Sequence, residues 1–201
     1  LKEGDEILQH IEGSNTDNLL FFTDRGQVYK SRASEFEDTK ASVLGDFIPA
    51  KLGMDEGETV LYMAVTSDFQ GYMLFCFENG KVAKVILSAY ETKTNRKKLV
   101  NAFNIKEKTA AILCLREDTQ VMLTASNGRV LLLPTGLLQV KATKDQQGVQ
   151  VMKLTKGSVL SNACPYEEGT LEEEHHYLAK TLPSRGDFLK DQLPGQTGLK
   201  E

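Results

Sequence analysis

The sequence predicts an all-β fold, a propeller-like ring of small repeated sheets. A twelve-residue hairpin pattern occurs three times, each copy turns at a glycine, and a strand-like run precedes each copy. Gly26, Gly80 and Gly128 are spaced by 54 and 48 residues, which gives a repeat near 50 residues. A plain β-sandwich is the alternative architecture. The recurrence of a polar-Gly-polar-Val pattern at equivalent points favours a ring of blades, each blade being one small sheet.

The hairpins read LLFFTDRGQVYK (19–30), MLFCFENGKVAK (73–84) and VMLTASNGRVLL (121–132). In each, an apolar run meets two polar residues, then the glycine, a polar residue and valine. Asn-Gly and the comparable Arg-Gly are tight-turn dipeptides, because a type I′ turn needs positive φ at both central positions. The Val, Phe, Tyr and Leu flanks favour strands. We therefore expect three β-hairpins.

The upstream runs are EILQHI (6–11), TVLYMAV (59–65) and AAILCL (110–115). The repeating unit is thus a strand, a short loop, a hairpin and a long connection. A fourth unit begins with LTKGSVLSNACPY (154–166) and contains one strand only. This half unit predicts that neighbouring blades share strands, or that a strand from elsewhere closes the ring.

We expect one repeat domain over residues 1–166, an incomplete ring in this fragment. Its repeats span about 1–53, 54–105 and 106–153, with a partial repeat at 154–166. Residues 167–201 contain EEGTLEEEHHY and two prolines and show little periodicity. We expect them to form an acidic, poorly ordered tail or an extended strap.

Charge is divided unevenly along the chain. The net charge is −4, yet residues 81–156 hold 14 Lys and Arg against 5 Asp and Glu, a local charge of +9. The second connection carries Lys93, Arg96, Lys97 and Lys98, and the third adds Lys141, Lys144 and Lys153. A basic middle of this size is a candidate polyanion surface if equivalent loops emerge at one rim. Charge alone leaves open a scattered distribution over every face.

The sequence offers little material for catalysis. Neither phosphate-loop glycine pattern nor a G-x-S-x-G elbow occurs. The adjacent His175 and His176 would point to opposite faces of a strand, and their spacing matches no zinc signature. The three cysteines, Cys76, Cys114 and Cys164, are interpreted as small buried hydrophobes of a reducing compartment. We therefore expect no catalytic residue, no metal and no cofactor in this domain.

Binding is the remaining function class. Lysine and arginine that follow phosphates suffice for DNA, and base contacts are unnecessary if the duplex is bent. The competing class is a propeller that binds proteins and not DNA, whose surface would carry aromatic and arginine anchors. The absence of tryptophan and the scattered tyrosines do not exclude it.

Taken together, the hairpins and the segments GDEIL and QGVQVMKLTKGSVL resemble the C-terminal domain of the A subunit of bacterial type IIA topoisomerases, gyrase and topoisomerase IV. The resemblance covers about residues 1–165, and LSAYETKTNRKKLVNAF is most similar to firmicute members. It implies a β-pinwheel of four-stranded, strand-swapped blades whose basic perimeter binds and bends duplex DNA. It also implies a cytoplasmic, nucleoid-associated domain without membrane contact. Its partners would be the rest of the A subunit, to which it is joined, with the ATPase B subunit of the holoenzyme.

The resemblance places Lys30 and Lys84 at the basic position that follows the hairpin turn. The third repeat has Leu131 and Leu132 there, which implies a weaker DNA contact. The other candidates come from charge alone. The predicted DNA-binding set is Lys30, Lys81, Lys84, Lys93, Arg96, Lys97, Lys98, Arg129, Lys141 and Lys144. The basic heptapeptide box of gyrase is absent, so bending of the topoisomerase IV kind and gyrase wrapping both stay open. The catalytic tyrosine belongs to a cleavage domain that has no counterpart here.

Overall fold

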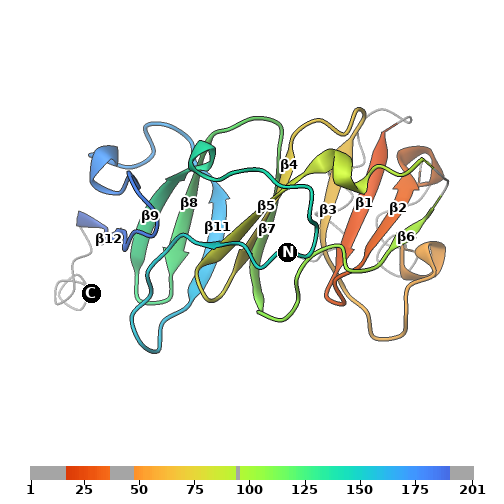
Figure 1. Cartoon of the computed structure of the whole chain (residues 1–201), viewed down its shortest axis with the longest axis horizontal. Helices are drawn as coiled ribbons and strands as arrows, with labels where there is room; N and C mark the ends of the chain where they lie inside the picture. Colours follow the sequence, from red (N-terminus) through yellow and green to blue (C-terminus); the bar gives the residue numbers. More distant parts are fainter. Residues whose placement is uncertain (1–16, 37–47, 94–95, 191–201) are drawn as a thin grey trace. The chain divides into compact units, whose positions relative to one another are not determined.

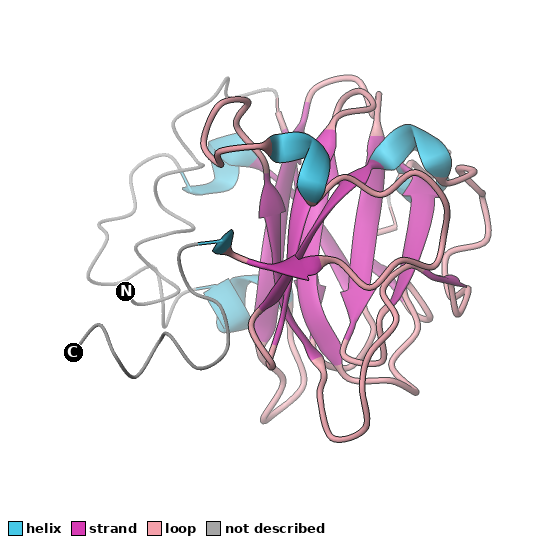
Figure 2. Ribbon diagram, turned by 90° about the vertical axis from the view of Figure 1, so that its left-hand side faces the viewer, coloured by secondary structure: helices cyan, strands magenta, loops and turns pink. Residues whose placement is uncertain are grey.

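A computed structural model describes residues 17–36, 48–93 and 96–190 of the chain. Strands dominate, and the short helical turns lie beyond the strand ends (Figure 2). The described residues fall into two compact units. Unit 1 takes those within Leu1–Gln70, Leu87–Ile105 and Thr143–Asp145, and unit 2 takes those within Gly71–Ile86, Lys106–Ala142 and Gln146–Glu201. The all-β prediction is confirmed, and each unit is described by itself below.

Unit 1 contains one four-stranded sheet, sheet A, in the order β3-β1-β2-β6 (Figure 1). Its strands are β1 (Asn18–Thr23), β2 (Val28–Arg32), β3 (Val60–Thr66) and β6 (Lys98–Leu99). The predicted hairpin at residues 19–30 is present as β1 and β2, which are antiparallel. Gly26 lies in its turn at φ +70°, and residues 48–52 are helical.

Unit 2 contains two such sheets (Figure 1). Sheet B has the order β10-β5-β4-β7, and sheet C has the order β11-β8-β9-β12. The strands of sheet B are β4 (Tyr72–Phe77), β5 (Lys81–Ile86), β7 (Thr109–Leu115) and β10 (Val149–Gln150). Those of sheet C are β8 (Gln120–Ala125), β9 (Arg129–Pro134), β11 (Leu160–Pro165) and β12 (Asp187–Phe188). The other two predicted hairpins are therefore present as well.

The long strand that follows each hairpin in sequence belongs to the sheet of that hairpin, although it opens the next repeat. Thus β3 pairs with β1, β7 with β4, and β11 with β8. The fourth strands β6, β10 and β12 also come from later in the chain and pair with β2, β5 and β9. The predicted sharing of strands is confirmed. The segment at 154–166, expected to be a partial fourth repeat, supplies β11 to sheet C, and the run at 6–11 lies outside the described residues.

Two finer features repeat with the hairpins. A register shift occurs beside each hairpin turn, between Phe22 and Thr23, between Cys76 and Phe77, and between Leu160 and Asn162. Short 3-10 helices follow each hairpin: η1 (Ala33–Phe36), η2 (Leu87–Tyr90) and η3 (Thr135–Leu137). Because each begins seven residues after the turn glycine, the three repeats have the same local design.

A glycine with positive φ precedes both β10 and β12. Gly148 has φ +81° and Gly186 has φ +71°. A Cβ atom would lie 2.5 Å from the Val82 carbonyl oxygen at Gly148 and 2.4 Å from the Val130 carbonyl oxygen at Gly186. These glycines therefore let the outer strand approach the hairpin closely enough to pair with it.

Residues 167–190, where we expected an acidic, poorly ordered tail or an extended strap, pack against sheet C. Tyr177 and Ala179 are buried, and β12 pairs with β9. The Leu132 N–H donates to the Tyr177 carbonyl at 2.8 Å, and the Ala179 N–H donates to the Leu132 carbonyl at 2.9 Å. The charged residues near η4 (Glu174–His176) make this segment polar in composition, so its few buried apolar residues could not be recognised from composition alone. Residues 191–201 lie outside the described part of the chain.

Cysteine placement agrees with the interpretation as small hydrophobes. Cys76 is buried, Cys114 and Cys164 are partly buried, and all three are free thiols. Burial raises the pKa of Cys76 to about 12 and that of Cys114 to about 11. Neither of these two thiols forms a reactive thiolate near neutral pH.

A buried carboxylate joins the hairpin turn of sheet A to the start of β3. Glu58 is 7% exposed and accepts hydrogen bonds from the Thr23 hydroxyl at 2.5 Å, the Gln27 amide at 2.9 Å and the Tyr29 hydroxyl at 2.7 Å. The Asp55 N–H donates to it at 3.0 Å. Burial raises the pKa of Glu58, but these four hydrogen bonds outweigh burial and lower it.

We expect Glu58→Ala to reduce the free energy of unfolding by about 1–3 kcal/mol, because it leaves buried donors without an acceptor. A lowered native pKa stabilises the fold above the unfolded pKa of about 4.3, and this contribution is lost as the pH falls through the native pKa. The difference between wild type and variant should therefore shrink below about pH 4. Urea unfolding followed by circular dichroism at several pH values measures it. Glu56→Ala, at an exposed neighbour, is the control, and an equal loss there would contradict the prediction.

Candidate nucleic-acid interface

Lys84 lies in the middle of β5 and is 5% exposed. Its ammonium group donates to Asp118 Oδ1 at 2.8 Å, to the Thr135 carbonyl at 2.9 Å and to the Leu138 carbonyl at 3.1 Å. It also lies 4.6 Å from the ring centroid of Tyr72. All three ammonium hydrogens are used inside unit 2, so the predicted DNA contact of Lys84 has no donor left. The structure therefore gives Lys84 a role inside unit 2, and its DNA contact stays a prediction.

Lys30 holds the same position in sheet A, four residues after the turn glycine. It is half-buried, and its ammonium group donates to the Thr92 hydroxyl at 2.9 Å. The ring centroid of Phe69 lies 5.7 Å away. Burial lowers the pKa of Lys30, and the nearby Glu91 opposes this shift. Lys30 thus faces a partly enclosed space, unlike a lysine on an open rim.

Lys81 and Arg129 directly follow the turn glycines of sheets B and C, and both are partly exposed. The Asn79 side chain accepts the backbone N–H of Lys81, and the Asn127 side chain accepts that of Arg129, each at 3.0 Å. The Arg129 guanidinium donates to the Gly186 carbonyl at 3.1 Å and lies 4.4 Å from the ring centroid of Phe188. Arg129 therefore holds β12 in place and keeps part of its charge at the surface.

The other predicted residues lie at exposed positions, with one partial exception. Lys93, Arg96, Lys97 and Lys98 are exposed in unit 1, and Lys98 lies 3.8 Å from an oxygen of Asp55. Lys141 is exposed, and its backbone pairs with β5 through hydrogen bonds to Lys84 and Ile86. Lys144 is partly exposed.

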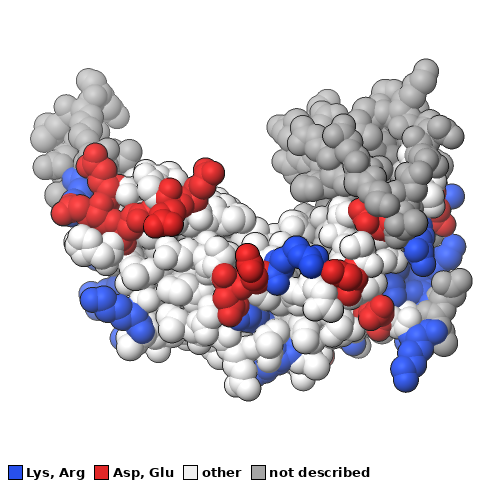
Figure 3. Space-filling model, turned by 90° about the horizontal axis from the view of Figure 1, so that it is seen from above, with Lys and Arg blue, Asp and Glu red and all other residues white. Residues whose placement is uncertain are grey.

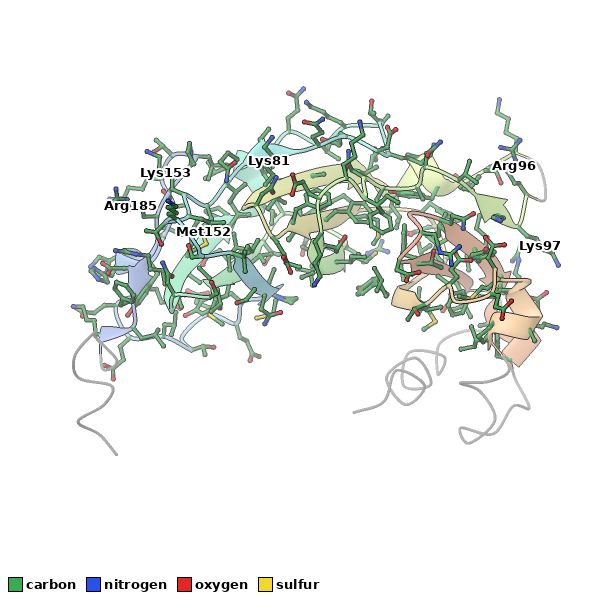
Figure 4. The ribbon with its side chains drawn as sticks, turned by 90° about the horizontal axis from the view of Figure 1, so that it is seen from below. Lys81, Arg96, Lys97, Met152, Lys153 and Arg185 are labelled. Atoms are coloured by element: carbon green, nitrogen blue, oxygen red, sulfur yellow. The ribbon has the colours of Figure 1, made fainter. Side chains whose placement is uncertain are left out.

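Three cations of unit 2 lie on adjoining segments. Lys81 is paired with Gln150 of β10, and the Lys153 N–H donates to the Ser184 carbonyl at 2.8 Å. Arg185 follows Ser184 directly, and both Lys153 and Arg185 are exposed. In Figure 4, Lys81, Lys153 and Arg185 follow one another along one edge of unit 2. This row, which we call the unit 2 basic row, is built from three segments that are far apart in the sequence.

Sequence reasoning missed Arg185 and left Lys153 outside the predicted set. The signal that locates Arg185 is the register of the outer strands. Leu99, Val149 and Asp187 pair with the valines that follow the three turn glycines by two residues. Two residues earlier stand Lys97 in sheet A, Gln147 in sheet B and Arg185 in sheet C. Two of the three sheets therefore carry a cation at the same place.

Features of other site classes are few in the described part of the chain. No group of three or more His, Cys, Asp or Glu could hold a metal ion there. His176 contacts Asp187 at 2.8 Å. Among the described helices, none is long and apolar enough to cross a membrane.

Comparison with known proteins shows what the repeats are similar to. The family described as "DNA gyrase C-terminal domain, beta-propeller" matches residues 17–67 and 119–163. These two segments hold the β1–β2 hairpin with β3, and the β8–β9 hairpin with most of β11. The chain is similar to the C-terminal domains of gyrase and topoisomerase IV A subunits.

Relatives of this family domain include A subunits of both enzymes. The chain is 28% identical over 140 residues to the chloroplastic/mitochondrial DNA gyrase A subunit of Arabidopsis thaliana, covering 69% of this chain and 15% of that protein. It is 26% identical over 171 residues to the DNA gyrase A subunit of Mycoplasma genitalium, covering 83% and 20%. The DNA topoisomerase 4 A subunit of Staphylococcus aureus is 26% identical over 126 residues, covering 62% and 16%. The chain therefore matches a fifth or less of the length of these relatives.

Solved structures share the fold. The C-terminal domain of DNA topoisomerase IV gives a TM-score of 0.72 at 22% identity, covering 87% of this chain and 58% of that one. The E. coli ParC C-terminal domain gives 0.64 at 16% identity, covering 89% and 78%. The propeller-like architecture predicted from the hairpins is thus confirmed, since the chain shares the fold of these domains.

We expect Lys84→Met to lower the free energy of unfolding by about 1–3 kcal/mol, because two buried carbonyls and Asp118 lose their donor. DNA affinity at equal folded concentration should stay unchanged, since the lost charge is buried. Lys153→Met is the matched control with the reverse pattern, unchanged stability and weaker DNA binding. Thermal melting and fluorescence anisotropy with a labelled duplex measure both. A normal melting temperature with reduced DNA affinity for Lys84→Met would contradict the assignment.

Proposed function

We propose that this chain binds duplex DNA through its phosphate backbone, as the non-catalytic C-terminal domain of a gyrase or topoisomerase IV A subunit. The observation that carries the proposal is the unit 2 basic row. The fold brings Lys81, Lys153 and Arg185 to one edge from separate segments. Lys153 and Arg185 are exposed and Lys81 is partly exposed, so their charges can reach a ligand at the surface.

The charge distribution around sheet C supports a one-sided ligand. In the view of Figure 3, acidic side chains gather beside the C-terminal trace, and basic side chains lie along the other edge of this part of unit 2. A polyanion approaching the basic edge therefore avoids the acidic one. Duplex DNA presents one phosphate charge per about 1.7 Å of its axis, so a row of cations releases several counterions on binding.

Unit 1 offers a second set of surface cations, Arg96 and Lys97, at the start of the outer strand of sheet A (Figure 4). No described element has the form of a recognition helix, and contacts of this kind position a duplex without reading its bases. Binding should accordingly be insensitive to sequence. Bending or wrapping, the cytoplasmic location, and association with the B subunit or with the rest of the A subunit belong to this proposal. So does strand passage by the whole enzyme, with the catalytic tyrosine on another domain.

Neutralising the unit 2 basic row tests the proposal. We expect Lys81→Gln, Lys153→Gln and Arg185→Gln together to reduce duplex affinity at least about tenfold at low salt. The slope of log affinity against log salt should fall in magnitude by about 3, one for each lost phosphate contact. Anisotropy titrations of duplexes of unrelated sequence, at several salt concentrations, measure both quantities.

Lys180→Gln combined with Lys190→Gln serves as the control, since it removes exposed lysines of unit 2 outside the row. It should leave the salt slope nearly unchanged. Loss of affinity for one duplex sequence only would argue against backbone binding. Absence of DNA binding by the wild type at low salt would overturn the proposal in favour of a protein-binding propeller.

A further inference from the structure

A polar cavity of about 430 Å³ opens beside Lys30 in unit 1. It lies between β2, Phe69 and the segment that leads into β6. Four cationic side chains, Lys30, Arg32, Arg96 and Lys97, and two carboxylates line it, a net formal charge of +2. A smaller adjoining cavity shares Lys30 and Lys97 and adds Lys51. The space is within the range of small-ligand sites, and its lining selects for an anion.

Lys30 has an incomplete set of partners. Within the described residues, its ammonium group has one hydrogen-bond acceptor, the Thr92 hydroxyl, so two of its hydrogens have none. Lys84, at the same place in sheet B, has three acceptors for three hydrogens. A partly buried cation keeps its charge at a cost unless hydrogen bonds replace the lost water. In sheet A, the cavity beside Lys30 takes the place of the three hydrogen-bond acceptors that surround Lys84 in sheet B.

The two carboxylates do not fill this role. Glu35 accepts hydrogen bonds from the Ser31 hydroxyl and from the Arg32 N–H, so it is directed at its own chain segment. Glu91 acts on Lys30 through charge, and no hydrogen bond joins the two in the described structure. Backbone pairing holds β2 beside the segment that leads into β6, since the Lys30 N–H donates to the Lys97 carbonyl at 2.7 Å. Lys97 is therefore held beside the cavity with its side chain exposed.

We propose that this cavity is a phosphate-binding site, and that its ligand is a small oligophosphate anion. Arginine and lysine together suit phosphate oxygens, which accept several hydrogen bonds at once. A net charge of +2 favours a multiply charged anion over a single carboxylate. The volume exceeds that of one phosphate group. A phosphodiester of duplex DNA is the other source of the same chemistry, but it carries one charge and is flanked by sugars.

The test is calorimetric titration of the whole chain with tripolyphosphate at constant ionic strength. We expect saturable binding to one site, at least about tenfold weaker for Lys30→Met, because this variant removes a charge-assisted hydrogen-bond donor from the cavity. Lys98→Met is the matched control, because Lys98 is exposed nearby but does not line the cavity. Its affinity should stay within about twofold of the wild type.

Lys97→Gln covers the case in which Lys30→Met does not fold, because Lys97 is exposed and its loss leaves the core intact. It should also weaken binding several-fold. The proposal is overturned if millimolar tripolyphosphate gives no saturable signal with the wild type. It is equally overturned if Lys30→Met and Lys97→Gln bind as the wild type does, or if Lys98→Met weakens binding as much as they do.

A duplex titration of the same variants separates the two sources of phosphate. With a free ligand, Lys30→Met keeps its DNA affinity, which is the expected result. A loss of DNA affinity in Lys30→Met that matches its loss of tripolyphosphate affinity assigns the same phosphate site to the DNA backbone. The variant without the unit 2 basic row should still bind tripolyphosphate. Failure of the DNA proposal and failure of this one are thereby told apart.

Discussion

Exchange of outer strands between repeats is the constraint on which the rest of the structure depends. A two-stranded hairpin is at best marginally stable alone, and its exposed edges invite wrong pairing. Here both edges of each hairpin are covered by strands from later in the chain. The strand on one side is six or seven residues long, whereas the strand on the other side has two. The short strand still matters, because the segment around it carries cations to the surface.

The short strands owe their position to backbone geometry. Gly148 and Gly186 have positive φ and leave no room for a Cβ atom beside the Val82 and Val130 carbonyls. Close approach there sets the register of β10 and β12, and register sets where Lys153 and Arg185 emerge. The unit 2 basic row is thus positioned in part by two residues that have no side chain of their own. Sheet A reaches the same pairing with Lys98 at this place, so glycine is one solution among others.

The hairpins were predictable because their signals are local. Asn-Gly turns, apolar runs and a repeat near 50 residues all lie within short windows of sequence. The two-residue strands and the packed segment at 167–190 carry no such period, and Arg185 was missed for that reason. The place of Lys84 was hidden differently. Its acceptors on Asp118, Thr135 and Leu138 lie 34, 51 and 54 residues away in the sequence. No local sequence pattern therefore predicts that these groups surround the Lys84 ammonium group.

At the position four residues after each turn glycine, the three repeats share the direction of the side chain but differ in residue type. Lys30, Lys84 and Leu132 all point to the same side of their sheets as the buried valines two residues earlier. Leu132 packs with Val130 and Tyr177, Lys84 is surrounded by oxygen acceptors, and Lys30 borders a cavity. What covers the position therefore decides its residue type. Leucine in the third repeat reflects an apolar cover, and the weaker DNA contact expected of that repeat stays a prediction. The cations Lys81, Arg129 and Arg185 lie one residue after the glycine or along the outer strands, where the cover of this position has no influence.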